Sequence, residues 1–333
     1  MSGLKLSICI PTYNRSLFLE EAIVSIVEQI TSDIVTLVEL CISDNASTDN
    51  TEEMVRKWQA EVPFSLIYHR NEENLGADLN YLKVIELANG DYCWYLGSDD
   101  RIKFGAIAKI LKELKGHCDI YLCNRTECDI DMRPVNDRHW LADDIKSMTY
   151  NLSCRDELLD YFDNSMSLGA VFSYLSSIIF IRVKWDRVKY VNEFTGSCYA
   201  HVFMLFSFLP FGLKLKYISD SYVYCRTGND FFGQEGGVRR LMIDIDGYSA
   251  IARHFFSHDR ELLQKLLSIK LHEIDNKTIA IVKFKACPAD WGKFNDFFMM
   301  SGGNKLRIVI IEWLVTFLRP LIGCVKKCDL SLG

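Results

Sequence analysis

Two adjacent carboxylates, Asp99 and Asp100, come just after the apolar segment Tyr92–Leu96. A buried strand that ends in two acids brings negative charge to the carboxyl edge of a sheet, where a divalent cation and a diphosphate can meet. An acidic dipeptide in front of a helix is also a common turn or cap. The pair therefore indicates nucleotide-sugar chemistry only if other segments bring matching groups to the same edge.

Two further predicted strands end in polar clusters. The apolar run 6–10 leads into Pro11–Arg15, and the run 38–43 leads into Asp44–Asp49. In a parallel sheet the carboxyl ends of all strands lie at one edge, which is where such sheets bind ligands. The three clusters together predict one site.

The order of elements predicts an α/β fold with a mostly parallel sheet. Residues 4–124 alternate apolar strands with amphipathic helices at the spacing of βαβ units, and residues 125–168 lose this periodicity, so we expect variable structure over the active face there. Beyond them we expect a strand over 171–182, a helix over 198–209, two short strands over 213–218 and 222–226, and helices over 238–256, 260–285, 291–300 and 306–321.

These patterns predict two regions. Residues 1–236 form a catalytic domain with a nucleotide-sugar half, 1–124, and an acceptor half, 125–236. Residues 237–333 form a helical C-terminal extension. No pattern in the sequence predicts an oligomeric state.

Composition excludes one class of partner and indicates a compartment. The 333 residues carry a net charge of −6 and no long Lys/Arg tract, so we expect no nucleic-acid partner. The twelve cysteines are dispersed without a CxxC pair, and residue 1 leads directly into a predicted strand rather than a signal peptide. We therefore expect a cytoplasmic location.

The segment Leu306–Gly323 is strongly apolar but is interrupted by charged residues and by Pro320. It is too short and too charged to predict a membrane-spanning helix. Trp313 and the following Lys326 and Lys327 are typical of a helix that lies in a membrane interface. A buried terminal helix is the alternative.

The N-terminal half resembles the family 2 glycosyltransferases of GT-A fold, which are Rossmann-like. Four motifs carry the resemblance, in the family's order: Ile10–Arg15, Asp44, Asn74-Leu75-Gly76 and Ser98-Asp99-Asp100. The match is close over residues 4–114 and looser over residues 171–229. Ser98 stands where the family usually has its first metal-motif aspartate.

The resemblance implies a nucleotide-sugar donor and a divalent cation, Mn²⁺ or Mg²⁺. It implies that Asp100 binds the metal, with Asp99 nearer the ribose or sugar, and that Arg226 in a loop over 224–229 clamps the diphosphate. The full set of residues implied to bind the donor is Pro11, Thr12, Tyr13, Arg15, Asp44, Asn45, Gly76, Asn80, Ser98, Asp99 and Arg226.

The catalytic base is where the sequence departs from the family. Inverting members usually present an acidic pair at the start of a helix, whereas the corresponding stretch here, 196–202, contains no carboxylate. The candidates are then His201 and Glu193. Two alternatives remain: His201 is a core residue, or the enzyme retains anomeric configuration and the leaving phosphate oxygen accepts the proton.

In length and layout the chain is similar to enterobacterial O-antigen abequosyltransferases. That likeness implies single transfers from CDP-abequose or a related dideoxyhexose to a polyprenyl-linked saccharide, with the enzyme peripheral on the cytoplasmic face of the inner membrane. The segment 172–180 could supply an apolar wall for such a sugar, although core packing is the alternative. The competing functions are a sugar nucleotidyltransferase, which the absence of glycine from Pro11–Arg15 disfavours, and an inactive saccharide-binding protein.

Overall fold

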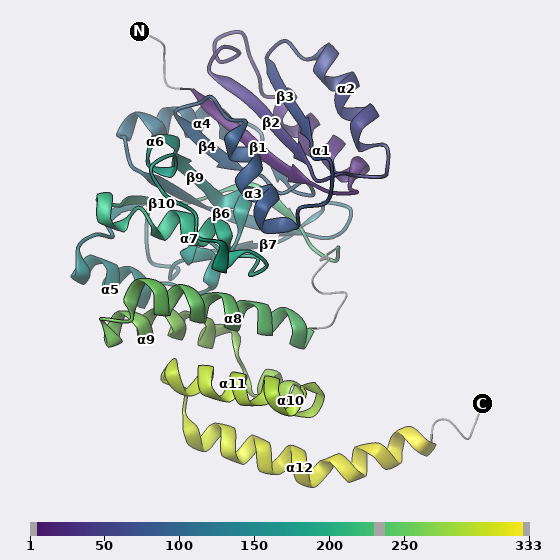
Figure 1. Cartoon of the computed structure of the whole chain (residues 1–333), viewed down its shortest axis with the longest axis vertical. Coiled ribbons are helices and arrows are strands. Elements are labelled where there is room, and N and C mark those ends of the chain that lie inside the picture. The colour runs from purple at the N-terminus through teal and green to yellow at the C-terminus, as the bar shows by residue number, and fades with distance from the viewer. Residues whose placement is uncertain (1–4, 230–236, 329–333) are drawn as a thin grey trace. The chain divides into compact units, whose positions relative to one another are not determined.

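The computed structural model describes residues 5–229 and 237–328 of the chain. The chain divides into two compact units, Met1–Asp230 and Phe231–Gly333. Figure 1 shows the helices and strands of each unit.

The first unit is built on a mixed sheet in the order β3-β2-β1-β4-β9-β6-β10-β5. The first four strands pair in parallel: β1 (Leu6–Thr12), β2 (Val38–Asp44), β3 (Ser65–Arg70) and β4 (Tyr92–Tyr95). The helices that alternate with them are α1 (Ser16–Val27), α2 (Thr51–Glu61), α3 (Ala77–Glu86) and α4 (Ala106–Glu113). The α/β prediction with a mostly parallel sheet is confirmed.

The other half of the sheet changes direction at β9 (Ile178–Ile181), which is antiparallel to both β4 and β6 (Ile120–Cys128). Beyond β6 lies β10 (Lys214–Arg226), which is parallel to β6. Strands β4 and β6 therefore run the same way, and their carboxyl ends share one edge with β1 and β2. The remaining elements are β5 (Arg101–Ile102), β7 (Pro134–Arg138), β8 (Met148–Asn151), α5 (Arg155–Asp163), α6 (Arg182–Trp185) and α7 (Ala200–Phe206).

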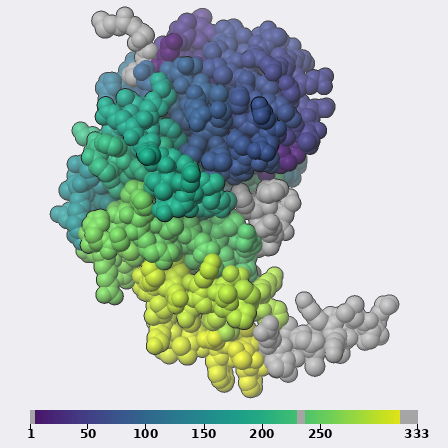
Figure 2. Space-filling view, in the orientation of Figure 1, coloured from purple at the N-terminus to yellow at the C-terminus, as the bar shows by residue number. Residues whose placement is uncertain are grey.

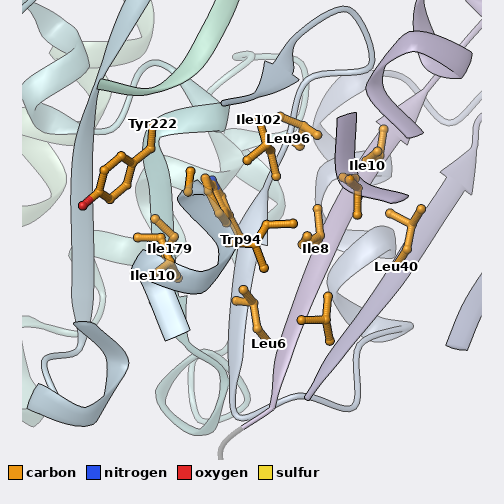
Figure 3. Close-up of a cluster of buried hydrophobic side chains, with 14 of the residues drawn as sticks. Leu6, Ile8, Ile10, Leu40, Trp94, Leu96, Ile102, Ile110, Ile179 and Tyr222 are labelled. Carbon is orange, nitrogen blue, oxygen red and sulfur yellow. The ribbon is translucent and has the colours of Figure 1, made fainter. Parts of the chain in front are cut away.

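Apolar side chains from the central strands form the core (Figure 3). Ile8, Leu40 and Trp94 are fully buried. Every residue of β1 and β2 is buried, because helices cover both faces of a parallel sheet. Strands in this position are mostly apolar along their whole length. This rigid centre fixes the strand ends that carry the polar clusters.

Three element predictions are wrong in detail. The expected strand over 171–182 is mostly 3₁₀ turns, with β9 only at its end, and the two strands expected over 213–226 are one strand, β10, with bulges near Ser221. The expected helix over 260–285 is interrupted by a 3₁₀ segment, Ile269–Glu273. A second helix starts there because the Asp275 carboxylate accepts a hydrogen bond from the Thr278 amide, 2.7 Å away.

The second unit is helical throughout its described part, as expected. Its helices are α8 (Gly237–Phe256), α9 (Arg260–Ser268), α10 (Asn276–Lys285), α11 (Pro288–Met300) and α12 (Lys305–Cys328). The buried ammonium of Lys270 lies 2.8 Å from Asp244 and also pairs with Glu273. These ion pairs join α8 to the segment that follows α9.

Helix α12 has two apolar faces up to Phe317. Ile308 and Ile311 are buried, α12 packs against α10, and Glu312 pairs with Lys283 of that helix. Figure 2 shows the surface of α12 up to residue 317 in yellow. On its other face the exposed residues are Leu306, Val309, Ile310, Trp313, Leu314 and Phe317. Within the described residues, no helix combines the length and apolar character needed to cross a bilayer.

Candidate functional site

The carboxylates of Asp99 and Asp100 converge on the turn that follows β4. A Cβ atom placed on Gly97 would lie 2.8 Å from Asp100 Oδ2 and 3.2 Å from Asp99 Oδ1. The two carboxylates therefore lie over the bare Cα of Gly97, and a side chain at this position would displace at least one of them.

Asp100 is buried and accepts hydrogen bonds on both oxygens. Oδ2 accepts from the Tyr174 hydroxyl at 2.7 Å and from the Ser176 hydroxyl, and Oδ1 accepts from the Arg226 amide at 3.2 Å. Burial, and then the charge of Asp99, raises the pKa of Asp100 to about 7. A cation beside this carboxylate would favour its ionised form.

Asp99 is held by two of the segments that were predicted to meet there. Its Oδ2 forms an ion pair with Arg15 and accepts a hydrogen bond from Asn229 Nδ2 at 2.7 Å. Arg15 also donates to the Asn229 carbonyl at 3.3 Å. The residues after β1, β4 and β10 thus meet at one point.

Asp44 lies at the end of β2, at the same sheet edge and one strand beyond β1. Its Oδ1 accepts from the Ser47 amide at 2.9 Å and its Oδ2 from the Tyr68 hydroxyl at 2.7 Å. The bond to Ser47 shapes the turn that follows β2. Thr12, which is opposite Asp44 in the β1–β2 register, is buried and its hydroxyl has no hydrogen-bond partner within the described residues.

Asn45 and Asn80 are linked to protein groups through a network of amides. Asn45 Oδ1 accepts from Asn71 Nδ2 at 3.0 Å and its Nδ2 donates to Asn74 Oδ1 at 2.8 Å, while Asn80 Oδ1 accepts from the Ser43 hydroxyl at 2.7 Å. These bonds shape the loops after β2 and β3.

Other predicted residues near this edge differ in accessibility. Gly76 has a φ of 82°, which favours glycine, and the space beyond its Cα is open. Tyr13 is partly exposed, whereas Pro11 and Ser98 are buried. Gly76 thus offers an open backbone position beside the amide network.

The Arg226 guanidinium, expected to clamp a diphosphate, is enclosed by protein. Its side chain is 2% exposed, and it pairs with Glu21, donates to the Asp99 carbonyl at 3.2 Å and to the Ile130 carbonyl, and lies 4.6 Å from the Phe18 ring centre. In this geometry Arg226 links α1 to the Asp99 turn.

His201 lies in the core. Its Nε2 is 2.9 Å from the Phe172 carbonyl, its Nδ1 has no hydrogen-bond partner within the described residues, and burial lowers its pKa to about 4. The edges of Tyr81 and Tyr95 pack around the ring. This environment favours the core-residue alternative over a base. Glu193 is exposed and belongs to the 3₁₀ turn Asn192–Phe194.

The segment before α7, where the family's acidic pair was expected, is held by a carboxylate from another helix. Asp78, in the first turn of α3, accepts from the amides of Gly196 at 2.8 Å, Cys198 at 2.9 Å and Ala200 at 3.0 Å. Desolvation raises the pKa of Asp78 although these bonds oppose the shift.

The carboxylate pair fits a hard divalent cation. The described residues contain no group of three or more His, Cys, Asp and Glu side chains that could enclose a metal ion alone. Two carboxylates are sufficient when a diphosphate and water supply the other oxygens, which is the usual arrangement for Mg²⁺ at phosphate substrates. Asp100 and Asp99 are the residues present for this role.

Sequence reasoning missed several residues that build the site. Tyr174 and Ser176 bind Asp100, Tyr68 binds Asp44, and Asn229 binds Asp99. Tyr174 and Ser176 fall in the segment expected to be a strand, and only the group of hydroxyl side chains inside this otherwise apolar segment could have signalled a role. Trp94 fixes this segment by donating to the Ser176 carbonyl at 2.8 Å.

Comparison with known proteins gives a family match and a relative that aligns over most of the chain. The family model of glycosyl transferase family 2 matches residues 7–173. Abequosyltransferase RfbV of Salmonella typhimurium is 41% identical over 271 residues, which cover 80% of this chain and 80% of that protein. GalNAc(5)-diNAcBac-PP-undecaprenol beta-1,3-glucosyltransferase of Campylobacter jejuni is 28% identical over 118 residues, which cover 35% of this chain and 37% of the relative.

Solved structures share the fold. The S. aureus TarS 1-349 structure in complex with UDP-GlcNAc aligns with a TM-score of 0.62 at 16% identity, covering 98% of this chain and 89% of that one. The mannosyltransferase PcManGT from Pyrobaculum calidifontis, in complex with GDP-Man and Mn²⁺, aligns with a TM-score of 0.54 at 14% identity, covering 95% and 87%. These alignments agree with the predicted GT-A fold and helical C-terminal region.

Proposed function

Because the chain belongs to glycosyl transferase family 2, we propose that it moves one sugar at a time from a nucleotide diphosphate sugar to a hydroxyl of a lipid-linked O-antigen saccharide. The proposed donor is CDP-abequose or a related dideoxyhexose, which the 41% identity with an abequosyltransferase supports. The undecaprenol-linked acceptor in the name of the Campylobacter relative supports a polyprenyl carrier. The observation that carries the proposal is the meeting of Asp44, Asp99 and Asp100 at one sheet edge.

The loops after β1 and β2 hold the nucleoside. Each oxygen of Asp44 accepts one hydrogen bond from the protein and retains a lone pair for a ribose hydroxyl or a base N–H. The backbone of Pro11–Tyr13 and the open space at Gly76 flank this carboxylate, and Asn45 and Asn80 hold the loops in place. These residues bind and orient the donor.

Asp100 would hold the divalent cation, with Asp99 beside it toward the ribose or sugar. When bound there, Mn²⁺ or Mg²⁺ would supply positive charge that offsets the charge on the departing diphosphate. Ser176 and Tyr174 fix the Asp100 carboxylate for this purpose. Arg15 is partly exposed and paired with Asp99, so it supplies positive charge beside the carboxylates. Arg226 holds the turn in place by donating to the Asp99 carbonyl.

Proton removal from the acceptor hydroxyl depends on the stereochemical course. For an inverting transfer we assign the base to Glu193, because its side chain is exposed, whereas the low pKa and burial of His201 make the imidazole a weak and inaccessible base. For a retaining transfer the leaving phosphate oxygen takes the proton. Turnover that survives in the Glu193→Gln variant would support the retaining course, and loss of turnover would support the base.

The test incubates the full chain with CDP-, UDP-, GDP- and dTDP-sugars, Mn²⁺ and a polyprenyl-linked saccharide, and measures nucleoside diphosphate release. We expect release with one donor, and a loss of at least about 100-fold in Asp100→Asn, because removing one well-placed charge from a transition-state site costs roughly 3 kcal/mol. The control is Asp143→Asn, a surface carboxylate whose side chain is 95% exposed, which should retain full activity.

The other outcomes separate the competing functions. Release of pyrophosphate from a nucleoside triphosphate and a sugar phosphate would identify a nucleotidyltransferase instead. Saccharide binding without any turnover, with the acceptor present, would identify a binding protein. Either result would overturn the transferase proposal.

We also propose that α12 rests on the cytoplasmic face of the membrane that contains the lipid-linked acceptor. The exposed apolar face from Leu306 to Phe317 supports this, because it follows helical spacing and carries the stacked rings of Trp313 and Phe317. A helix in this position would keep the enzyme where its acceptor is embedded.

A further inference from the structure

A further strand end reaches the edge where the carboxylates meet. Strand β6 pairs with β9 only from Ile120 to Leu122, and its carboxyl-terminal part continues to Cys128 between β10 and the edge strand β7. Because β6 runs in the same direction as β4, this part of β6 lies at the ligand-binding edge. Its charged residues were not among those predicted for the site.

Side chains alternate along this part of β6, and two charged residues share one face. Thr126 binds Lys103 and Asp137 on one side. On the other side Arg125 and Glu127 form an ion pair at 2.8 Å. The two faces therefore have separate partners.

The Arg125 guanidinium lies over two neighbouring aromatic rings. Its central carbon lies 4.4 Å from the centre of the Tyr174 ring and 4.9 Å from that of Trp140. Stacking on aromatic faces and an ion pair with Glu127 orient this planar group without using all of its five N–H donors. Its buried Nε has no hydrogen-bond partner among the described residues.

Tyr174 connects this pair to the metal-binding carboxylate. The ring that supports Arg125 donates its hydroxyl to Asp100 at 2.7 Å. Arg125 is therefore separated from Asp100 by a single side chain. The side chains of Arg125 and Glu127 remain 20% and 19% exposed, so the pair is partly open to solvent at the ligand-binding edge.

We propose that Arg125 and Glu127 bind hydroxyl groups of a pyranose ring beside Asp100 and help to determine which sugar the enzyme accepts. A planar donor next to a planar acceptor suits adjacent sugar hydroxyls, which both donate and accept. The ring belongs either to the donor or to the first residue of the acceptor. This inference rests on the proposed function.

The experiment compares full-length Arg125→Lys and Glu127→Gln with the wild type. Arg125→Lys keeps the charge but loses the planar, stacked geometry. We expect KM for one sugar substrate to rise by about tenfold, the effect of losing roughly one charge-assisted hydrogen bond. Affinity for the nucleoside diphosphate with Mn²⁺, measured by calorimetry, should stay unchanged.

Two kinetic measurements identify the source of the sugar ring. A higher KM in acceptor-free hydrolysis of the donor assigns the ring to the donor, and a higher acceptor KM alone assigns it to the acceptor. The matched control is Arg138→Lys, because Arg138 also bonds Glu127, at 3.0 Å, but lies on the edge strand β7 with a side chain 58% exposed. It should leave both KM values unchanged.

A purely structural role has a different signature. Unchanged KM values in Arg125→Lys and Glu127→Gln would overturn the proposal, and a lower melting temperature in the same variants would show that the pair only stabilises β6 and its packing. Failure of the wild type to bind any nucleoside diphosphate would instead overturn the proposed function. The two failures are thus distinguishable.

Discussion

At the scale of single residues, polar groups at this sheet edge serve two distinct purposes. In the proposed function Asp44, Asp99 and Asp100 bind the donor and the cation in addition to their protein partners, whereas the bonds of Arg226, Asn45 and Asn80 go to protein groups. Residue type and spacing in the sequence cannot separate these purposes, because both use polar side chains at strand ends. The difference lies in which atoms each side chain contacts in the folded chain. The partners of each atom make the distinction.

His201 gives a prediction about acid stability. Its pKa falls from an ordinary 6.5 to about 4 because the ring is buried, so below pH 6.5 the unfolded chain takes up a proton that the folded chain excludes. The free energy of unfolding should therefore fall as pH falls from 6.5 to 4, and this group contributes up to roughly 3 kcal/mol of that loss. Thermal melts at pH 7 and pH 4.5 should show a smaller acid-induced drop in His201→Gln than in the wild type.

The control for this measurement is His139→Gln, because His139 is on the surface with a side chain 40% exposed. That variant should melt like the wild type at both pH values. An equal acid-induced drop in His201→Gln and the wild type would show that the buried imidazole does not cause the sensitivity.

At the scale of elements, Asp78 joins two segments that are far apart in sequence. Helix α3 begins directly after Gly76, and its first turn binds the amides that precede α7. One helix therefore supports both the loop beside Asp44 and the start of α7. A carboxylate with three amide donors is a strong arrangement, since each bond is charge-assisted.

Replacing Asp78 with Asn should loosen the start of α7. One carboxylate oxygen becomes an amide group that donates rather than accepts, so a buried N–H loses its partner, and we expect a loss of about 1–3 kcal/mol in the free energy of unfolding. Denaturant unfolding measures this. The control Glu53→Gln, at an exposed position in the first turn of α2, should change stability by less than about 0.5 kcal/mol.

The elements that were predicted well from the sequence are those whose formation depends on residues close together in the chain. Strands β1, β2 and β4 are mostly apolar, so their existence and the position of the acidic turn after β4 follow from the local sequence. The extension of β6 to Cys128 was missed because Arg125 and Glu127 interrupt its apolar pattern. The bonds from Tyr174 to Asp100 and from Asp78 to Ala200 were missed because contacts across 74 and 122 positions leave no local signal.

At the scale of the whole molecule, the net charge and the exposed apolar face of α12 have opposite effects on binding to an anionic membrane. The chain carries a net charge of −6, which opposes approach to an anionic lipid surface. The six exposed apolar side chains between Leu306 and Phe317, the part of α12 whose side chains are described, must then supply most of the attraction, and burying each large apolar group contributes roughly 1.5–3 kcal/mol. Binding driven in this way does not require anionic lipids.

This argument predicts that the full chain binds neutral phosphatidylcholine vesicles and that Trp313→Glu with Phe317→Glu abolishes the binding, because two charges would enter the apolar interface. Cosedimentation measures it. Transfer to a water-soluble acceptor should be unchanged in the same variant. Phe104→Glu, which adds a charge at an aromatic residue 84% exposed in the first unit, is the matched control and should still bind. Equal binding of the double variant and the wild type would contradict a membrane role for α12.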